Sequence, residues 1–223
     1  MIEINSIFQS ISGECGGIPQ GAYTTFIRLQ GCNLRCGYCD AKGAVESGRG
    51  KLVEINDILA SCWTKNVIIT GGEPLFQPKV LTLIDELLNR GHVVQVETNG
   101  TIELPDKLWF FKPEKLFWVV DFKQHAPNAS VNYVNWAMVW QSQFFLKFVV
   151  ENENHIINAF NVISKFPASV FEKKYMAGIA ISPAEGKDKL IPLILDNAKL
   201  MLTPKMLDLF ILNIQIHKIA GLD

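Results

Sequence analysis

The chain has 223 residues, of which 48% are hydrophobic and 19% charged, and its formal net charge is −1. This composition excludes wholesale disorder, and the mixing of basic and acidic residues argues against a dedicated nucleic-acid binder, so a small molecule is the expected partner. Neither a membrane span nor a secretory signal is predicted, and we expect one domain over 1–223 in the cytoplasm.

Hydrophobic periodicity predicts strands that alternate with helices. Strands are expected at 24–31, 66–72, 92–100, 116–123, 144–150 and 177–183. Helices are expected at 52–63, 78–91, 153–166 and 191–202, 212–218 is expected to be a last strand or an extended tail, and 102–115 shows no clear pattern. The strands are nearly continuous apolar runs, as in a sheet covered on both faces. The fold class is therefore α/β, with a parallel sheet that is open or curled into a partial barrel.

Three of the five cysteines lie in GCNLRCGYCD, at residues 31–40: Cys32, Cys36 and Cys39. In a reducing compartment, clustered thiols point to metal or redox chemistry rather than to disulfides. Thiolates suit an iron–sulfur cluster or zinc, but Cys15 and Cys62 stand alone and no histidine lies within the group. The count of three indicates a damaged site, a distant fourth donor, or a position left open for another molecule.

Polar residues follow the ends of several predicted strands. These motifs are TGGEPL at 70–75, ETNG at 97–100, DFKQH at 121–125 and SPAEG at 182–186. Each motif alone is also an ordinary turn. In parallel α/β folds, however, the carboxyl ends of the strands form one rim where ligands bind, so together the motifs predict one site.

The spacing Cys-x-x-x-Cys-x-x-Cys after a strand, with Tyr38 before the last cysteine, resembles the signature of the radical S-adenosylmethionine superfamily. The resemblance implies a partial β/α barrel in which three thiolates hold a four-iron cluster and leave its fourth iron to S-adenosylmethionine. Reduction of that cofactor then releases a 5′-deoxyadenosyl radical. The resemblance and the polar strand ends together predict these cofactor-binding residues: Tyr38, Asp40, Gly72, Glu73, Glu97, Asp121, Lys123, Ser182 and Glu185.

The segment FQSISGECGGIPQGAYTTFIRLQGCNLRCGYCD and the terminal LNIQIHKIAGLD resemble the 7-carboxy-7-deazaguanine synthases. Members abstract hydrogen from C6 of 6-carboxy-5,6,7,8-tetrahydropterin, contract its ring, release ammonia and regenerate the cofactor, and the product feeds queuosine-type deazapurines. The resemblance also implies a homodimer and a flavodoxin or ferredoxin as electron donor. The substrate contacts that it implies are Ser12, Gly13, Glu14, Arg28, Thr70, His217 and Asp223.

Two of these contacts also follow from the chemistry of the residues. Arg28 lies within an apolar strand, where a guanidinium needs a partner, and it can pair in a bidentate manner with a substrate carboxylate. The alternative is an arginine at a strand edge that reaches solvent. Glu14 can accept hydrogen bonds from the amino and ring N–H groups of a pterin.

Two positions depart from the family pattern. Ser12 stands where the family has a glutamine, and its shorter hydroxyl cannot reach as far. Ala41 follows Cys39-Asp40 where the family commonly has a threonine that helps to hold Mg²⁺ at the substrate carboxylate. Because Ala41 has no ligand atom, Lys42 is a candidate to supply positive charge in place of the metal. The alternative is an ion held by another carboxylate or by waters.

Two other functions stay open at this level. An activase of glycyl-radical enzymes would share the cysteine and Gly-Gly-Glu-Pro elements but would lack the Ser-Gly-Glu block and the C-terminal His-Lys pair. A non-catalytic iron–sulfur or zinc module would need neither a glycine-rich cofactor loop nor polar residues gathered at strand ends.

Overall fold

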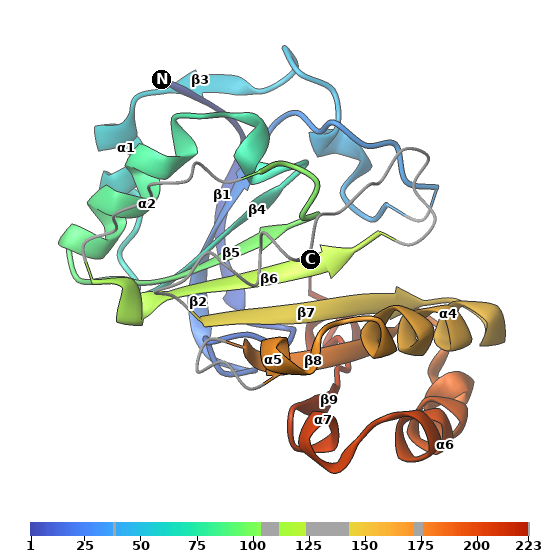
Figure 1. Cartoon of the computed structure of the whole chain (residues 1–223). Helices are drawn as coiled ribbons and strands as arrows, with labels where there is room; N and C mark the ends of the chain where they lie inside the picture. The colour runs from blue at the N-terminus through green and yellow to red at the C-terminus, as the bar shows by residue number, and fades with distance from the viewer. Residues whose placement is uncertain (38, 104–111, 124–142, 172–175, 223) are drawn as a thin grey trace.

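The computed structural model describes residues 1–37, 39–103, 112–123, 143–171 and 176–222. These residues form a nine-stranded sheet with the order β3-β1-β2-β4-β5-β6-β7-β8-β9 (Figure 1). The strands are β1 (Ile2–Ile11), β2 (Tyr23–Leu29), β3 (Lys51–Val53), β4 (Asn66–Gly71), β5 (Val93–Thr98), β6 (Leu116–Phe122), β7 (Gln143–Val150), β8 (Met176–Pro183) and β9 (Phe210–Leu212).

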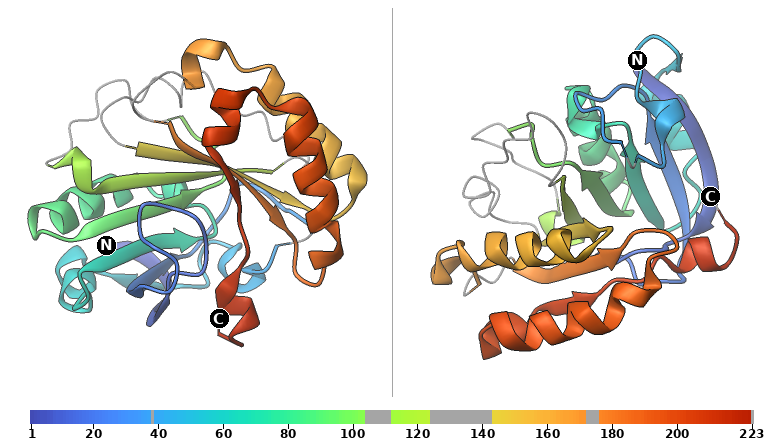
Figure 2. Two further views of the ribbon diagram at one scale, coloured as in Figure 1. Left: turned by 90° about the horizontal axis from the view of Figure 1, so that it is seen from below. Right: turned by 90° about the vertical axis from the view of Figure 1, so that its right-hand side faces the viewer.

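From β2 to β9, neighbouring strands in the sheet are parallel. The sheet curves without its edge strands meeting, and the longer helices lie on its outer side (Figure 2). The predicted partial barrel is therefore confirmed. Its helices are α1 (Ile55–Ala60), α2 (Val80–Asn89), α4 (Glu153–Ser164), α5 (Ala168–Phe171), α6 (Ile191–Met201), α7 (Pro204–Asp208) and α8 (Ile216–Ile219), with 3-10 turns η1 (Lys42–Ala44), η2 (Pro74–Phe76), η3 (Pro113–Lys115) and η4 (Asp188–Leu190).

The two faces of the sheet differ in polarity because successive side chains of a strand point to opposite faces. On β7, Leu146 and Phe148 belong to the hydrophobic core, whereas Lys147 and Val149 line a cavity on the other face. The outer face is closed by apolar residues of the helices, such as Leu83 of α2. The concave face is thus free to carry polar side chains, which near-continuous apolar strands had not suggested.

Three details correct the sequence-based expectations. Ile2–Ile11 forms a strand that was not predicted, and it pairs antiparallel with β2, so the sheet is mixed at this edge. The helix expected at 52–63 is only α1, because Lys51–Val53 pairs antiparallel with β1. The expected strand or tail at 212–218 is instead the end of β9 followed by the single helical turn of α8.

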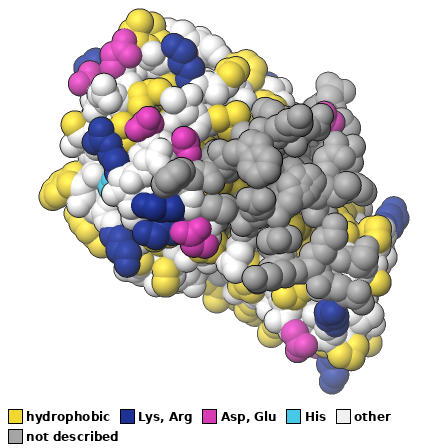
Figure 3. Space-filling view, turned by 60° about the vertical axis from the view of Figure 1, so that its left-hand side comes forward, with side chains coloured by type: hydrophobic (Ala, Val, Ile, Leu, Met, Phe, Trp, Pro, Cys, Tyr) yellow, Lys and Arg dark blue, Asp and Glu magenta, His cyan; other side chains and the backbone are white. Residues whose placement is uncertain are grey.

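None of the described helices is long and apolar enough to cross a membrane. On the face of the molecule shown in Figure 3, basic and acidic side chains are intermixed.

Candidate active site

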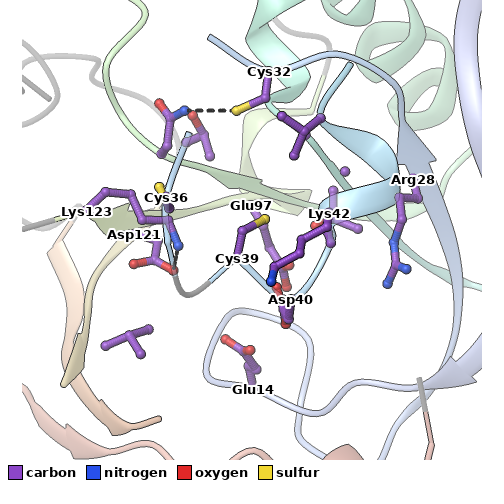
Figure 4. A pocket seen from close by; sticks show the side chains of 18 of the residues that line it. Glu14, Arg28, Cys32, Cys36, Cys39, Asp40, Lys42, Glu97, Asp121 and Lys123 are labelled. Carbon is purple, nitrogen blue, oxygen red and sulfur yellow. Dashed lines mark hydrogen bonds and ion pairs between the residues drawn. The ribbon is translucent and has the colours of Figure 1, made fainter. Parts of the chain in front are cut away.

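A cavity of about 590 Å³ lies on the concave face of the sheet, at the carboxyl ends of the parallel strands. It collects most of the described residues that the sequence had singled out (Figure 4). They are Gly13, Glu14, Arg28, Cys32, Cys36, Cys39, Asp40, Ala41, Lys42, Thr70, Gly72, Glu97, Asp121, Lys123, Glu185 and His217. Residues from all four polar strand ends therefore line one cavity.

The three cysteines come from the loop that follows β2, and all three thiols are free and partly exposed to this cavity. The loop is fixed at its start, where Cys32 N donates to Val45 O at 2.9 Å. Asn99 Nδ2 lies 3.9 Å from the Cys32 sulfur and donates a hydrogen bond to Asn33 Oδ1 at 3.0 Å. The residues that follow β5 therefore support the cysteine loop. Soft thiolates gathered on one loop are suitable ligands for an iron–sulfur cluster.

The other two cysteines, Cys15 and Cys62, are buried and lie outside the cysteine loop. Burial raises the pKa of Cys62 to about 11, and its thiol donates to Ile58 O at 3.3 Å. Burial likewise raises the pKa of Cys15 to about 12. Neither Cys15 nor Cys62 lines the cavity.

The Gly-Gly-Glu loop after β4 packs directly on the start of the cysteine loop. Glu73 N donates to Gly31 O at 2.9 Å, and a Cβ at Gly72 would lie 2.2 Å from that same oxygen. Only glycine therefore permits this contact. Whereas Gly72 lines the cavity, the side chain of Glu73 is fully buried beneath it.

The Glu73 carboxylate links the ends of β4 and β5. It accepts hydrogen bonds from Leu75 N at 3.0 Å, from Thr98 Oγ1 at 2.7 Å and from Asn99 N at 2.7 Å. The side chain of Glu73 does not line the cavity, and a contact between Glu73 and the cofactor stays a prediction. In this structure Glu73 positions the loop that carries Gly72 and the asparagine that supports Cys32.

Charged side chains cover the floor of the cavity. Lys123 Nζ lies 2.8 Å from Asp121 Oδ2, Lys147 Nζ lies 3.5 Å from the same oxygen, and Lys147 also forms an ion pair with Glu14. Burial alone would raise the pKa of Asp121, but the two lysines hold it below its ordinary value. Burial raises the pKa of Glu97 to about 7, and the negative charge of Glu14 contributes to this shift. The sequence had not singled out Lys147.

The N-terminal loop and the C-terminal segment meet at the other end of the cavity. Ile216 N donates to Gly13 O at 3.1 Å, and Gln215 Nε2 donates to Glu14 Oε1 at 2.6 Å. A Cβ at Gly13 would lie 1.8 Å from His217 Nδ1, so the glycine makes room for the histidine. Segments that are about 200 residues apart in sequence therefore form one wall.

Three polar atoms in the cavity are buried without a hydrogen-bond partner among the described residues. They are Arg28 Nε, Asp121 Oδ1 and His217 Nδ1. Arg28 stacks over the Phe8 ring, with its guanidinium carbon 5.2 Å from the ring centroid. All three residues line the cavity, although these particular atoms are themselves covered by protein.

Like Glu73, the predicted site residues Ser12 and Ser182 do not line the cavity. The Ser12 hydroxyl is buried and donates to Ile18 O at 3.4 Å, and the Ser182 hydroxyl is buried and accepts from Asn213 Nδ2 at 3.2 Å. Both serines fix the protein around the cavity instead of facing it. Tyr38 and Asp223 lie outside the described residues.

Comparison with known proteins agrees with this site. The family model described as "Radical SAM superfamily" matches residues 26–135. The fold, the cysteine loop and the match to this family model together place the chain in the class of radical S-adenosylmethionine enzymes. The 7-carboxy-7-deazaguanine synthase of Clostridium acetobutylicum is 34% identical over 95% of this chain and 92% of that protein. That of Aquifex aeolicus is 37% identical over 69% of this chain and 67% of that protein. The chain belongs to the 7-carboxy-7-deazaguanine synthase family.

A solved structure supports the fold. The crystal structure of QueE from Escherichia coli matches with a TM-score of 0.72 and 23% sequence identity, covering 96% of this chain and 93% of that one. Family membership implies a four-iron cluster and S-adenosylmethionine. The residues fit both groups, because three free thiols on one loop open into a cavity that continues past them along the strand ends.

Proposed function

We propose that this chain converts 6-carboxy-5,6,7,8-tetrahydropterin to 7-carboxy-7-deazaguanine with loss of ammonia. The observation that carries the proposal is a single cavity. It is lined both by the three cysteines and by a cation, a carboxylate and a histidine from distant segments: Arg28, Glu14 and His217. Their placement fits a substrate that has one carboxylate and a guanine-like edge.

The cluster with S-adenosylmethionine supplies, when bound, the radical that removes hydrogen from C6 of the pterin. Cys32, Cys36 and Cys39 would hold the cluster. Gly72 leaves its backbone open to the cofactor, and we assign the polar groups nearer the cysteines to it as well. They are Asp40, Glu97, Asp121, Lys123 and Glu185.

The remaining cavity residues bind and orient the pterin in this proposal. Arg28 lines the cavity and pairs through its guanidinium with the substrate carboxylate. Glu14 accepts from the amino and ring N–H groups through its remaining lone pairs, while Gln215 donates to its Oε1 and Lys147 pairs with its Oε2. Thr70 and Arg28 are neighbours in the register of β2 and β4, so both act on the same part of the ligand. His217 contacts the ligand from the wall formed by the C-terminal segment, with its Nδ1 turned to Gly13.

The test is anaerobic turnover. Reconstituted and reduced protein is incubated with S-adenosylmethionine and the pterin, and carboxydeazaguanine is measured by mass spectrometry. The wild type and Cys62→Ala are expected to form product, whereas Cys36→Ala is expected to form none. Product formed by Cys36→Ala would contradict the proposal. Radical transfer to a protein in place of pterin turnover would favour an activase.

We further infer that magnesium is not held in the manner of the family. Ala41 supplies no ligand atom, whereas Lys42 lines the cavity, so its ammonium can attract the substrate carboxylate instead (Figure 4). Activity is then expected to be the same in chelator as with added Mg²⁺, and to fall in Lys42→Gln. Strong dependence on magnesium would rule this out. The homodimer and the flavodoxin or ferredoxin donor stay predictions from the family.

A further inference from the structure

Lys147 is a charged residue in the middle of an otherwise apolar strand, QFFLKFVV. Its side chain is 8% exposed, and it points to the concave face because its neighbours Leu146 and Phe148 belong to the core on the other side. An ammonium buried in this way is costly unless it is paired. The partners of Lys147 therefore decide whether its charge has a role in the cavity.

The partners of Lys147 come from two different parts of the site. Its Nζ forms an ion pair with Glu14 of the N-terminal loop and lies 3.5 Å from Asp121 Oδ2 of β6. Asp121 is the register neighbour of Lys147, so the pairing of β6 with β7 fixes this contact. Glu14 is held from its other side by Gln215.

These contacts join into one chain of polar groups across the cavity. It runs from Lys123 to Asp121, then through Lys147 to Glu14, and ends at Gln215 next to the C-terminal helix α8. One end lies near the cysteine loop, where Lys123 and Asp121 act electrostatically on Cys36. The other end lies beside His217. Lys147 stands at its centre.

We propose that Lys147 is a positioning residue that fixes the substrate contact Glu14 relative to the cofactor contact Asp121. This assignment rests on the proposed function, and it adds the residue that holds the substrate-binding side of the cavity in place relative to the cofactor-binding side. The ammonium attracts both carboxylates where they are poorly solvated, with Lys123 as a second cation on Asp121, and it orients both as a donor that they share. Without it, Glu14 would turn away from its neighbour Asp121 because like charges repel.

The test is a double-mutant cycle between Lys147 and Glu14. Lys147→Met keeps the length of the side chain and removes the charge, and it is expected to weaken pterin binding by at least about 30-fold, as when one partner of a buried charge pair is lost. Lys147→Arg is expected to recover part of that loss. Lys115→Met, outside the cavity, is the matched control and is expected to leave binding unchanged.

Pterin binding is measured by anaerobic calorimetry, and KM and kcat are measured separately. In the cycle, Glu14→Gln with Lys147→Met is expected to cost little more than Glu14→Gln alone, because the two residues act as a pair. Additive losses, or a Lys147→Met enzyme with wild-type affinity and KM, would overturn the assignment.

The same cycle is run on the free energy of unfolding of the cluster-free protein. It separates this assignment from the proposed function, because it requires neither cofactor nor substrate. Failure of the wild type to turn over the pterin would contradict the function alone. Coupling between Glu14 and Lys147 in unfolding would still support the pair, and additive effects there would overturn it.

Discussion

The buried carboxylate of Glu73 is expected to stabilise the site without facing it. Its Oε1 accepts from Leu75 N and Thr98 Oγ1, and its Oε2 accepts from Asn99 N. Burial raises the pKa of Glu73, while these donors favour its ionised form. In Glu73→Gln the amide oxygen can keep the first two bonds, but the amide nitrogen then meets the N–H of Asn99. Two donors face each other in a buried site.

The size of the effect follows from this one lost bond. A hydrogen bond to a charged group contributes about 1.5–3 kcal/mol, and a buried donor left unpaired costs about 1–3 kcal/mol. The lower desolvation cost of a neutral amide offsets part of this. We therefore expect Glu73→Gln to lower the free energy of unfolding by about 2 kcal/mol, which corresponds to roughly 4–8 °C in Tm for a chain of this size.

The assay is denaturant unfolding of the cluster-free protein, with iron content after reconstitution as a second readout. Asn99 supports Cys32, so the variant is also expected to retain less iron. Glu86→Gln on the exposed side of α2 is the matched control and is expected to change stability by less than about 0.5 kcal/mol. If Glu73→Gln matched that control in both stability and iron content, the link between the ends of β4 and β5 would not have the role assigned to it.

Two further predictions concern the backbone and the pH dependence of the site. In Gly72→Ala the new Cβ would lie 2.2 Å from the backbone oxygen of Gly31, so this variant is expected to lower stability and iron retention. The control is Gly43→Ala, whose Cβ would meet nothing within 4 Å, and it is expected to lower neither. Equal effects of the two variants would contradict the packing argument. The pKa of Glu97 is raised from 4.5 to about 7 by burial, so between these pH values the folded chain holds a proton that the unfolded chain has released. As pH rises through this window, the unfolding free energy of the wild type should therefore fall by on the order of 1–3 kcal/mol relative to that of Glu97→Gln. Parallel profiles of unfolding free energy against pH for the two proteins would refute the pKa shift.

The sequence predicted the parallel strands and the site at their ends because both depend on local patterns. Continuous apolar runs indicated the strands, and motifs such as TGGEPL gave their ends. The strand Ile2–Ile11 was missed because its pairing with β2 is interrupted between Ile4 and Ser6 and several of its residues are only partly buried. Lys51–Val53 was missed because three residues are too few to show a period.

The contacts of the site were harder to predict because they join distant segments. The direction of Glu73, towards Thr98 and Asn99, depends on how the ends of β4 and β5 are placed side by side. Lys147 carried a signal that could have been used, since a lysine within FFLKFVV has the same problem of burial as Arg28 within FIRLQ. What the sequence does not contain is the identity of its partners.

The charge pattern of the cavity follows from the fold and the chemistry acting together. A ligand with charged and polar edges requires charged side chains, and the alternation along each strand places them on the concave face only. Neighbouring strands then bring such residues into register, as with Asp121 and Lys147, so that each buried charge is balanced by the next. A substitution that removes one charge therefore alters both the stability of the sheet and the position of the residues that bind ligand. For this reason the coupling between Lys147 and Glu14, rather than the loss from either variant alone, measures what the pair contributes to the site.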